Sequence, residues 1–244
     1  MKPFLLMLAF FTRLPLPEIP YTEERYLRGI PLLPLVGAVT GALLWGASYA
    51  RPYLPGPLSG VLLFLLYLLI TGGLHLDGLA DSCDALFSGR DRETMLEIMK
   101  DSRSGSFGVL GLIVAAAFYL ALLPEASPAA LFFFPVIGKC TPALAVQLSP
   151  YVRPEGMARL FAGGCTRSRA WGGTALTLFV LGLAEPDLLL PAALSLVLAL
   201  ALTRRVRRTL GGITGDVLGL LCEVSQIAFL ALIPLFETIS KNIS

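Results

Sequence analysis

Charged residues are scarce in this chain of 244 residues. Asp, Glu, Lys and Arg make up 15% of it, against roughly 25% in ordinary soluble domains, and hydrophobic residues make up 55%. So high an apolar content excludes disorder. So few charges cannot cover so large an apolar core, which argues against a soluble fold. The net charge of +2 argues against a nucleic-acid-binding protein, which needs a concentrated basic face. The composition predicts an all-α, polytopic integral membrane protein, with residues 1–244 as a single membrane-embedded domain.

Residues that bind soft metals are also scarce. The chain has one histidine, His75, and four cysteines that form neither a CxxC pair nor a disulfide framework. Any metal must therefore be held by oxygen, which favours magnesium, manganese or calcium. The sequence lacks Gly-x-Ser-x-Gly and the Walker pattern Gly-x-x-x-x-Gly-Lys-Ser/Thr, so acyl transfer and ATP hydrolysis are disfavoured.

Seven apolar stretches approach the roughly 20 residues that a transmembrane helix needs. The fifth and sixth are short and are separated by only three residues, so they can also form a hairpin that does not fully cross. We therefore expect about six to seven transmembrane helices. The stretch 3–11 is too short to span and predicts an interfacial or partly buried helix. The seven candidates are 30–50, 58–74, 105–123, 129–149, 172–184, 188–203 and 217–236.

The basic residues alternate between the two sides of these stretches. Four of the 19 lie in each of the segments 1–29, 75–104, 150–171 and 204–216. Because Lys and Arg are enriched in cytoplasmic loops, these segments and the N-terminus are predicted inside, and the C-terminus outside. Nearly all the carboxylates lie on the same side. We expect a multi-pass protein of the cytoplasmic (inner) membrane with its active site facing the cytoplasm.

Three carboxylates follow the second apolar stretch at helical spacing. Asp77, Asp81 and Asp84 are spaced i, i+4, i+7 and share one face of a helix. Like charges on one face repel, most strongly near low-dielectric surroundings, and a divalent cation with positions open for phosphate oxygens would neutralise them. Gly78 leaves room for a close approach beside Asp77. The alternative is a solvated acidic face, but a stripe at the membrane boundary favours a functional site.

A second polar segment leads into the third apolar stretch. Lys100, Asp101 and Arg103 lie among hydroxyl and glycine residues, after a predicted short amphipathic helix. The two cations can pair with phosphate. They can equally anchor the start of a helix at lipid headgroups, so this segment alone leaves both interpretations open.

A third polar segment surrounds the start of the last apolar stretch. Asp216 and Glu223 are spaced i, i+7, so they share a helix face and can face the same cavity. Glu223 lies two turns inside an apolar helix, where it needs a metal, a proton or a cationic partner. In an ion-coupled transporter these would be coupling carboxylates. Acids concentrated in loops on one side argue against that class, because transporter sites lie near the midplane.

The three segments in this order resemble the cobalamin synthase family, the adenosylcobinamide-GDP ribazoletransferases. The resemblance covers most of the chain, including AFFTRLPLP near the start and PLVGAVTGAL in the first stretch. Ser82-Cys83 stands where Thr-Ala is common in the family, and Gln226 where a second Glu is common. The family is distantly similar to the CDP-alcohol phosphotransferases. The matching motifs are TGGLHLDGLADSCDAL, KDSRSGSFG and GGITGDVLG with a downstream Glu.

The resemblance implies a membrane transferase of cobalamin (vitamin B12) biosynthesis. Its partners would be the lipid bilayer and two substrates, adenosylcobinamide-GDP and alpha-ribazole or its 5'-phosphate, which it would join with release of GMP. No nucleic acid is implied, and the sequence allows a homo-oligomer. The rival phosphotransferase of phospholipid synthesis expects Asp-Gly-x-x-Ala-Arg and then Gly-x-x-x-Asp-x-x-x-Asp. Here Asp77-Gly78-Leu79-Ala80 is followed by Asp81 and Ser82, without the Ala-Arg pair, and the second half is absent.

The resemblance also implies roles for individual residues. Mg²⁺, with Mn²⁺ as an alternative, would bridge the Asp-rich helix and the diphosphate. Our hypothesis for the group that orients the attacking hydroxyl or takes its proton is Asp84, with Asp101 as second candidate. The implied metal and diphosphate site consists of Asp77, Asp81, Asp84 and Asp101. The implied substrate-binding residues are His75, Lys100, Arg103, Asp216 and Glu223.

Overall fold

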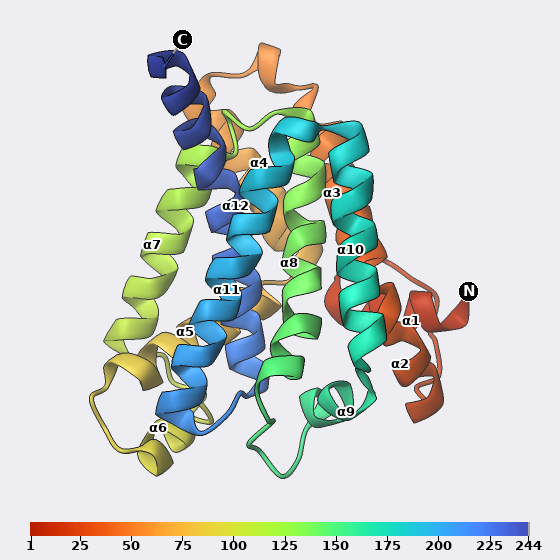
Figure 1. Cartoon of the computed structure of the whole chain (residues 1–244), viewed down its shortest axis with the longest axis vertical. Helices are drawn as coiled ribbons and strands as arrows, with labels where there is room; N and C mark the ends of the chain where they lie inside the picture. The colour runs from red at the N-terminus through yellow and green to blue at the C-terminus, as the bar shows by residue number, and fades with distance from the viewer. Residues whose placement is uncertain (244) are drawn as a thin grey trace.

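Long helices dominate the architecture. The computed structural model describes residues 1–243, with side chains through residue 239, and over this range it contains helices and one isolated β-bridge, between Tyr151 and Ile213. Figure 1 shows the long helices side by side along the longest axis of the molecule. They are α3 (Leu33–Ser48), α4 (Gly56–Thr71), α7 (Ser106–Leu122), α8 (Pro128–Leu148), α10 (Arg167–Ala184), α11 (Leu189–Leu210) and α12 (Gly215–Ile243).

The shorter α-helices gather toward the end of the bundle opposite the C-terminus (Figure 1). Helix α1 is the predicted short N-terminal helix, and its residues 6–8 are buried. The short helices are α1 (Lys2–Phe11), α2 (Glu23–Gly29), α5 (Leu74–Phe87), α6 (Arg92–Ile98) and α9 (Met157–Gly164). The 3₁₀ helices are η1 (Ile30–Leu32), η2 (Arg51–Tyr53) and η3 (Pro186–Leu188).

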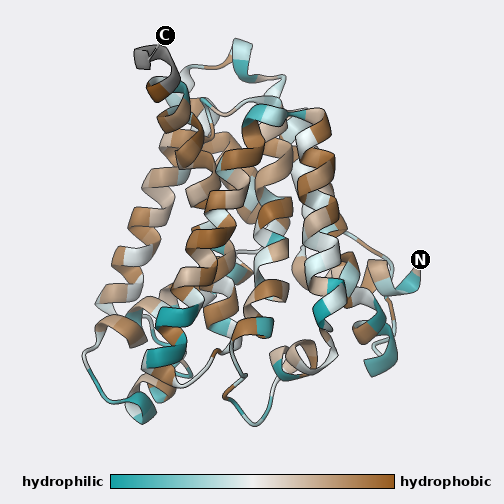
Figure 2. Ribbon diagram, in the orientation of Figure 1, coloured by the Kyte–Doolittle hydropathy of each residue, from teal (hydrophilic) through white to brown (hydrophobic). Residues whose placement is uncertain are grey.

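The apolar helices make this a multi-pass membrane protein. Among the residues that the structure describes, four helical segments are long and apolar enough to cross a bilayer, or five if the bent pair of α4 and α5 forms one span. Each of the seven predicted stretches coincides with one long helix, while a count of six to seven crossings stays a prediction. In Figure 2, many hydrophilic residues lie at the end that carries α6 and α9, and hydrophobic residues dominate the middle of the long helices. The four qualifying segments are Glu23–Tyr53, Pro128–Leu148, Pro186–Leu210 and Gly215–Ile239.

Two glycines turn the chain away from the bundle axis after α4. Gly72 and Gly73 both have left-handed backbone conformations, with φ of 63° and 70°, which side chains other than hydrogen disfavour. Gly72 ends α4 and Gly73 begins α5, and the two helices meet at 93°. Helix α5 therefore leaves the direction of the span, and we treat it as lying outside the membrane-spanning segments.

Helix α5 crosses α12 at very close range. A Cβ atom on Gly78 would lie 2.8 Å from the backbone oxygen of Asp216, and one on Gly219 would lie 3.0 Å from the backbone oxygen of His75. Only glycine fits at such a contact. The crossing brings the start of α5, with the first polar segment, against the start of α12, with the third.

Candidate active site

A cavity of about 310 Å³ lies where α1, α5, α8, α9 and α12 converge with the loop before α9. The elements that line it include α5 and α9, which lie at the end of the bundle opposite the C-terminus (Figure 1). Its apolar wall includes Phe10, Phe11, Tyr26, Met157 and Phe161. Its ionisable lining residues, apart from Tyr side chains, are His75, Asp77, Lys139, Arg153, Glu155 and Asp216.

Two of the predicted carboxylates, Asp77 and Asp216, line this cavity from facing helices. Asp216 pairs with Arg153, whose Nη2 lies 2.7 Å from its Oδ2. The loop that carries Arg153 is fixed to the start of α12 by backbone hydrogen bonds from Val152 N to Ile213 O and from Ile213 N to Pro150 O, at 3.0 and 2.9 Å. The ion pair is therefore held by the backbone on both sides.

Asp81 adds further negative charge beside the cavity without lining it. Burial, followed by the charges of Asp77, Asp216 and Asp84, raises the pKa of the Asp81 carboxyl from 3.8 to about 6, although Arg153 opposes the shift. Burial is the larger cause of this shift, and the remainder comes from repulsion by the neighbouring carboxylates, which a bound cation would relieve. The cluster is therefore suited to a bound cation.

The carboxylates fit a cation that takes some of its ligands from a substrate. In the part of the chain that the structure describes, no group of three or more His, Cys, Asp or Glu side chains is already assembled to hold a metal ion. The donors available are carboxylate oxygens, which suit hard cations. Mg²⁺ is commonly bound by one or two carboxylates together with substrate phosphates and water, and Asp77 and Asp216 match that pattern.

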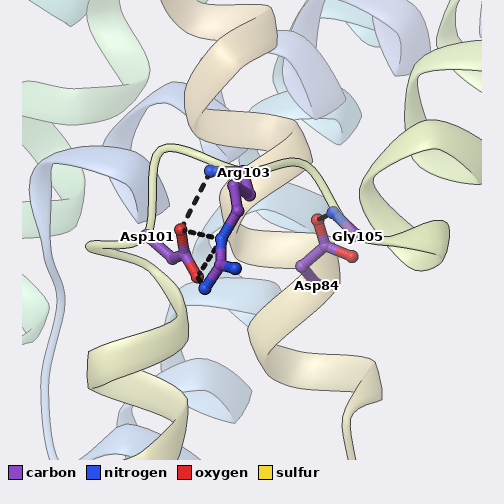
Figure 3. Close-up of polar contacts among 4 residues, drawn as sticks. All are labelled: Asp84, Asp101, Arg103 and Gly105. Carbon is purple, nitrogen blue, oxygen red and sulfur yellow. Dashed lines mark hydrogen bonds and ion pairs between the residues drawn. The ribbon is translucent and has the colours of Figure 1, made fainter.

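The carboxylate of Asp84 binds backbone N–H groups at the start of α7. Its Oδ2 accepts the backbone N–H of Gly105 at 2.7 Å and its Oδ1 accepts that of Gly108 at 2.8 Å. Figure 3 shows the Asp84 side chain directed at Gly105, at the start of α7. A carboxylate at a helix N-terminus satisfies unpaired backbone N–H groups and interacts favourably with the helix dipole. Asp84 thus fastens α7 to α5 and does not line the cavity.

The second polar segment stays at the surface. Arg103 forms an exposed ion pair with Asp101, with Nη2 and Oδ2 2.8 Å apart, as Figure 3 shows. Hydrogen bonds from Arg103 hold the pKa of Asp101 below its ordinary value. Lys100 is exposed as well. None of these three residues is among those that line the cavity, so the structure does not bring the segment into the same site as Asp77 and Asp216.

Glu223 is buried away from the cavity among hydroxyl groups. Tyr67 donates a hydrogen bond to its Oε1 at 2.7 Å, and Tyr119 donates one to its Oε2 at 2.6 Å. Gln226 donates to the Tyr67 hydroxyl at 3.1 Å. The spacing of Asp216 and Glu223 allows them to face one cavity, but in the structure only Asp216 lines it. The partners of Glu223 are phenols of α4 and α7, which it links to α12.

Sequence reasoning did not assign the two cations of the cavity. Arg153 lies in the basic segment 150–171 and Lys139 in the apolar stretch 129–149, and the sequence alone assigns neither residue to the site. Lys139 lies close to His75, with its Nζ against the ring Nε2, and its Nζ is 4.7 Å from the centroid of the Phe11 ring. A lysine inside an apolar stretch is a signal of function by itself. The sequence does not show which residues Lys139 contacts, because these come from other helices.

The comparisons with known proteins agree with the motifs. Residues 3–234 match the family model of cobalamin-5-phosphate synthase. Three curated relatives bear the name adenosylcobinamide-GDP ribazoletransferase: those of Alkaliphilus oremlandii, Acetivibrio thermocellus and Citrobacter koseri, at 37%, 38% and 39% identity. The matches cover 94%, 97% and 94% of this chain, and 96%, 99% and 98% of the relatives. A comparison with solved structures gives no match. With a family match over nearly its whole length, the chain belongs to the cobalamin-5-phosphate synthase family.

Proposed function

We propose that this protein joins adenosylcobinamide-GDP to alpha-ribazole, or to its 5'-phosphate, and releases GMP. The observation that carries the proposal is one cavity, lined by residues of the first and third family motifs, in which carboxylates and cations face each other. Such a cavity suits a substrate with a diphosphate group. The family and the names of the relatives favour this reaction over phospholipid synthesis and over ion-coupled transport.

We propose that Asp77 and Asp216, with Asp81 beside them, hold a Mg²⁺ ion, a role that Mn²⁺ can also fill. The ion would neutralise diphosphate charge and stabilise the leaving GMP. Arg153, already paired with Asp216, would keep this carboxylate in place before the substrate binds. Asp84, in this proposal, is a positioning residue that holds α7 against α5.

The apolar wall suits the other substrate. The hydroxyl oxygen of alpha-ribazole would form a bond to the phosphorus nearer the corrinoid, the bond from that phosphorus to the GMP oxygen would break, and the hydroxyl proton would be released to the solvent or to the departing phosphate. We propose that the flat aromatic base of alpha-ribazole packs against Phe10, Phe11 and Tyr26, because aromatic side chains provide both stacking and apolar area. The roles predicted for Lys100, Asp101 and Arg103 stay predictions.

We further propose that the cavity faces the cytoplasm from the inner membrane. Three of the four basic segments connect helices at the end of the bundle that holds the cavity (Figure 1). Lys and Arg concentrate on the cytoplasmic side of membrane proteins. Residues 1–244 would act as one domain in the lipid bilayer, and whether they form a homo-oligomer stays a prediction.

Release of GMP tests the proposal. The purified protein in detergent micelles, given adenosylcobinamide-GDP, alpha-ribazole and Mg²⁺, should release GMP and form the joined corrinoid product in equal amounts. A reaction without alpha-ribazole is the control, and should release little GMP. Equal release with and without alpha-ribazole would indicate a hydrolase, and no release under any of these conditions would contradict the proposed activity.

A further inference from the structure

Lys139 is a buried cation in the middle of a membrane helix. It lies on α8, whose flanking residues are almost all buried, and only 5% of Lys139 is exposed. A charge at such a depth is costly and calls for a partner. Its position on the wall of the cavity places it in the same space as Asp77 and Asp216.

No carboxylate among the side chains described up to residue 239 is in direct contact with Lys139, and Glu223 acts on it only from a longer distance. Its Nζ lies against Nε2 of His75 and over the ring of Phe11. Among side chains up to residue 239, none of the ion pairs within 4.0 Å involves it. The other cation of the cavity, Arg153, already has a carboxylate partner in Asp216. Lys139 is thus the cavity's Lys or Arg side chain that, up to residue 239, forms no ion pair within 4.0 Å.

We propose that Lys139 binds the diphosphate of the nucleotide substrate, an inference that rests on the proposed function and identifies a residue for it. An ammonium group has three hydrogen-bond donors. One is directed to His75, and the others are available to phosphate oxygens in the cavity. Phe11 stabilises the ammonium group before the substrate binds, because a cation is attracted to the face of an aromatic ring.

The family resemblance implies that Lys100 and Arg103 bind the substrate, whereas this proposal assigns the diphosphate to Lys139. Lys100 and Arg103 are exposed, and Arg103 is paired with Asp101 at the surface. A cation in a low-dielectric cavity attracts phosphate more strongly than one in water. Lys139 therefore contributes to diphosphate affinity even if the surface cations assist the approach of the substrate.

The test compares ligands with and without phosphate in Lys139→Met and Lys139→Gln, with Lys2→Met as a matched control at an exposed position in α1. In the presence of Mg²⁺, both Lys139 variants should bind GDP at least tenfold more weakly than the wild type. Their KM for adenosylcobinamide-GDP should rise at least tenfold, whereas their KM for alpha-ribazole should stay within threefold. Lys2→Met should leave all three values unchanged. A merely structural lysine would affect both substrates alike.

The outcomes separate this inference from the proposed function. If the wild type is active but GDP affinity changes less than threefold in either folded Lys139 variant, the inference is wrong while the function stands. A fall in kcat with both KM values unchanged would also overturn it, since it would assign Lys139 to the chemical step. If the wild type lacks transfer activity and its GDP affinity still depends on Lys139, the function fails and the diphosphate site stands. Thermal melting identifies which variants are folded. If Lys139→Met does not fold, Lys139→Gln still permits the test, because glutamine is polar and similar in length to lysine.

Discussion

The hydrogen bonds from two tyrosine hydroxyls to Glu223 provide the sharpest test of how α4, α7 and α12 pack together. Tyr67 and Tyr119 each donate to one carboxylate oxygen, and all three side chains are buried. In water-soluble proteins, a hydrogen bond to a charged group contributes about 1.5–3 kcal/mol. In membranes, double-mutant cycles average only about 0.6 kcal/mol, with a maximum of about 1.7 kcal/mol, because the unfolded chain also finds partners. We therefore expect the lower range for the Tyr119–Glu223 pair.

The cycle consists of Tyr119→Phe, Glu223→Leu and the double variant. Each single variant leaves one partner without its hydrogen bond, whereas the double variant removes both groups. The double variant should therefore be less destabilised than the sum of the single changes, by about 0.6–1.7 kcal/mol. The free energy of unfolding is measured by titration with SDS in mixed micelles. Additivity of the two changes within about 0.3 kcal/mol would refute the assigned hydrogen bond.

Three further predictions concern other parts of the site. Asp84→Ala should destabilise the protein by at least about 2 kcal/mol in the same assay, because the start of α7 loses two hydrogen bonds to a charged acceptor. Equal stability would exclude the anchoring role. In EDTA, Asp81→Asn should melt at a higher temperature than the wild type at pH 7.5, and the difference should disappear toward pH 4. The raised pKa of about 6 means that ionisation of Asp81 weakens the fold as the pH rises from 4 through 6; a difference independent of pH would contradict this. In a cysteine-free background, single cysteines at the exposed positions 90 and 209 should be labelled only from the cytoplasm, and one at the exposed position 125 only from outside. The reverse pattern would overturn the orientation.

The long helices could be predicted from the sequence because apolar runs of this length must be helical in a bilayer. All seven stretches appear as helices, with ends shifted by up to seven residues. The sharp turn at Gly72 and Gly73 was not predicted. Two consecutive left-handed glycines permit a change of direction, but its angle depends on what α5 packs against.

Asp77, Asp81 and Asp84 share one face of α5, but they do not all contribute to one site. Residues seven apart in a helix point the same way but lie about 10 Å apart along its axis. Asp77 is therefore beside α12 and the cavity, whereas Asp84 reaches the start of α7. The same displacement separates Asp216 from Glu223, which lies deeper in the bundle beside Tyr67. Spacing predicts a face, and only the packing of neighbouring helices decides which partner each residue meets.

The residues missed in the site come from elements outside the polar segments. Lys139 lies in an apolar helix, Phe11 in the N-terminal helix and Arg153 in a loop between helices. Their convergence depends on contacts between elements far apart in the chain. Sequence periodicity does not report such contacts, whereas a charge in an apolar run does indicate where to look.

The most direct test of the central claim, that the cavity between α5 and α12 is the active site, compares two aspartates. Turnover of adenosylcobinamide-GDP is measured by GMP release for Asp77→Asn, in the cavity, and for the matched variant Asp187→Asn, in η3 at the opposite end of the bundle. We predict that Asp77→Asn loses at least a hundredfold in kcat/KM at saturating Mg²⁺, which is about 2.7 kcal/mol of transition-state stabilisation. Asp187→Asn should keep wild-type activity, and both should melt as the wild type or higher. Near-normal turnover by a folded Asp77→Asn protein would contradict the assignment of the site.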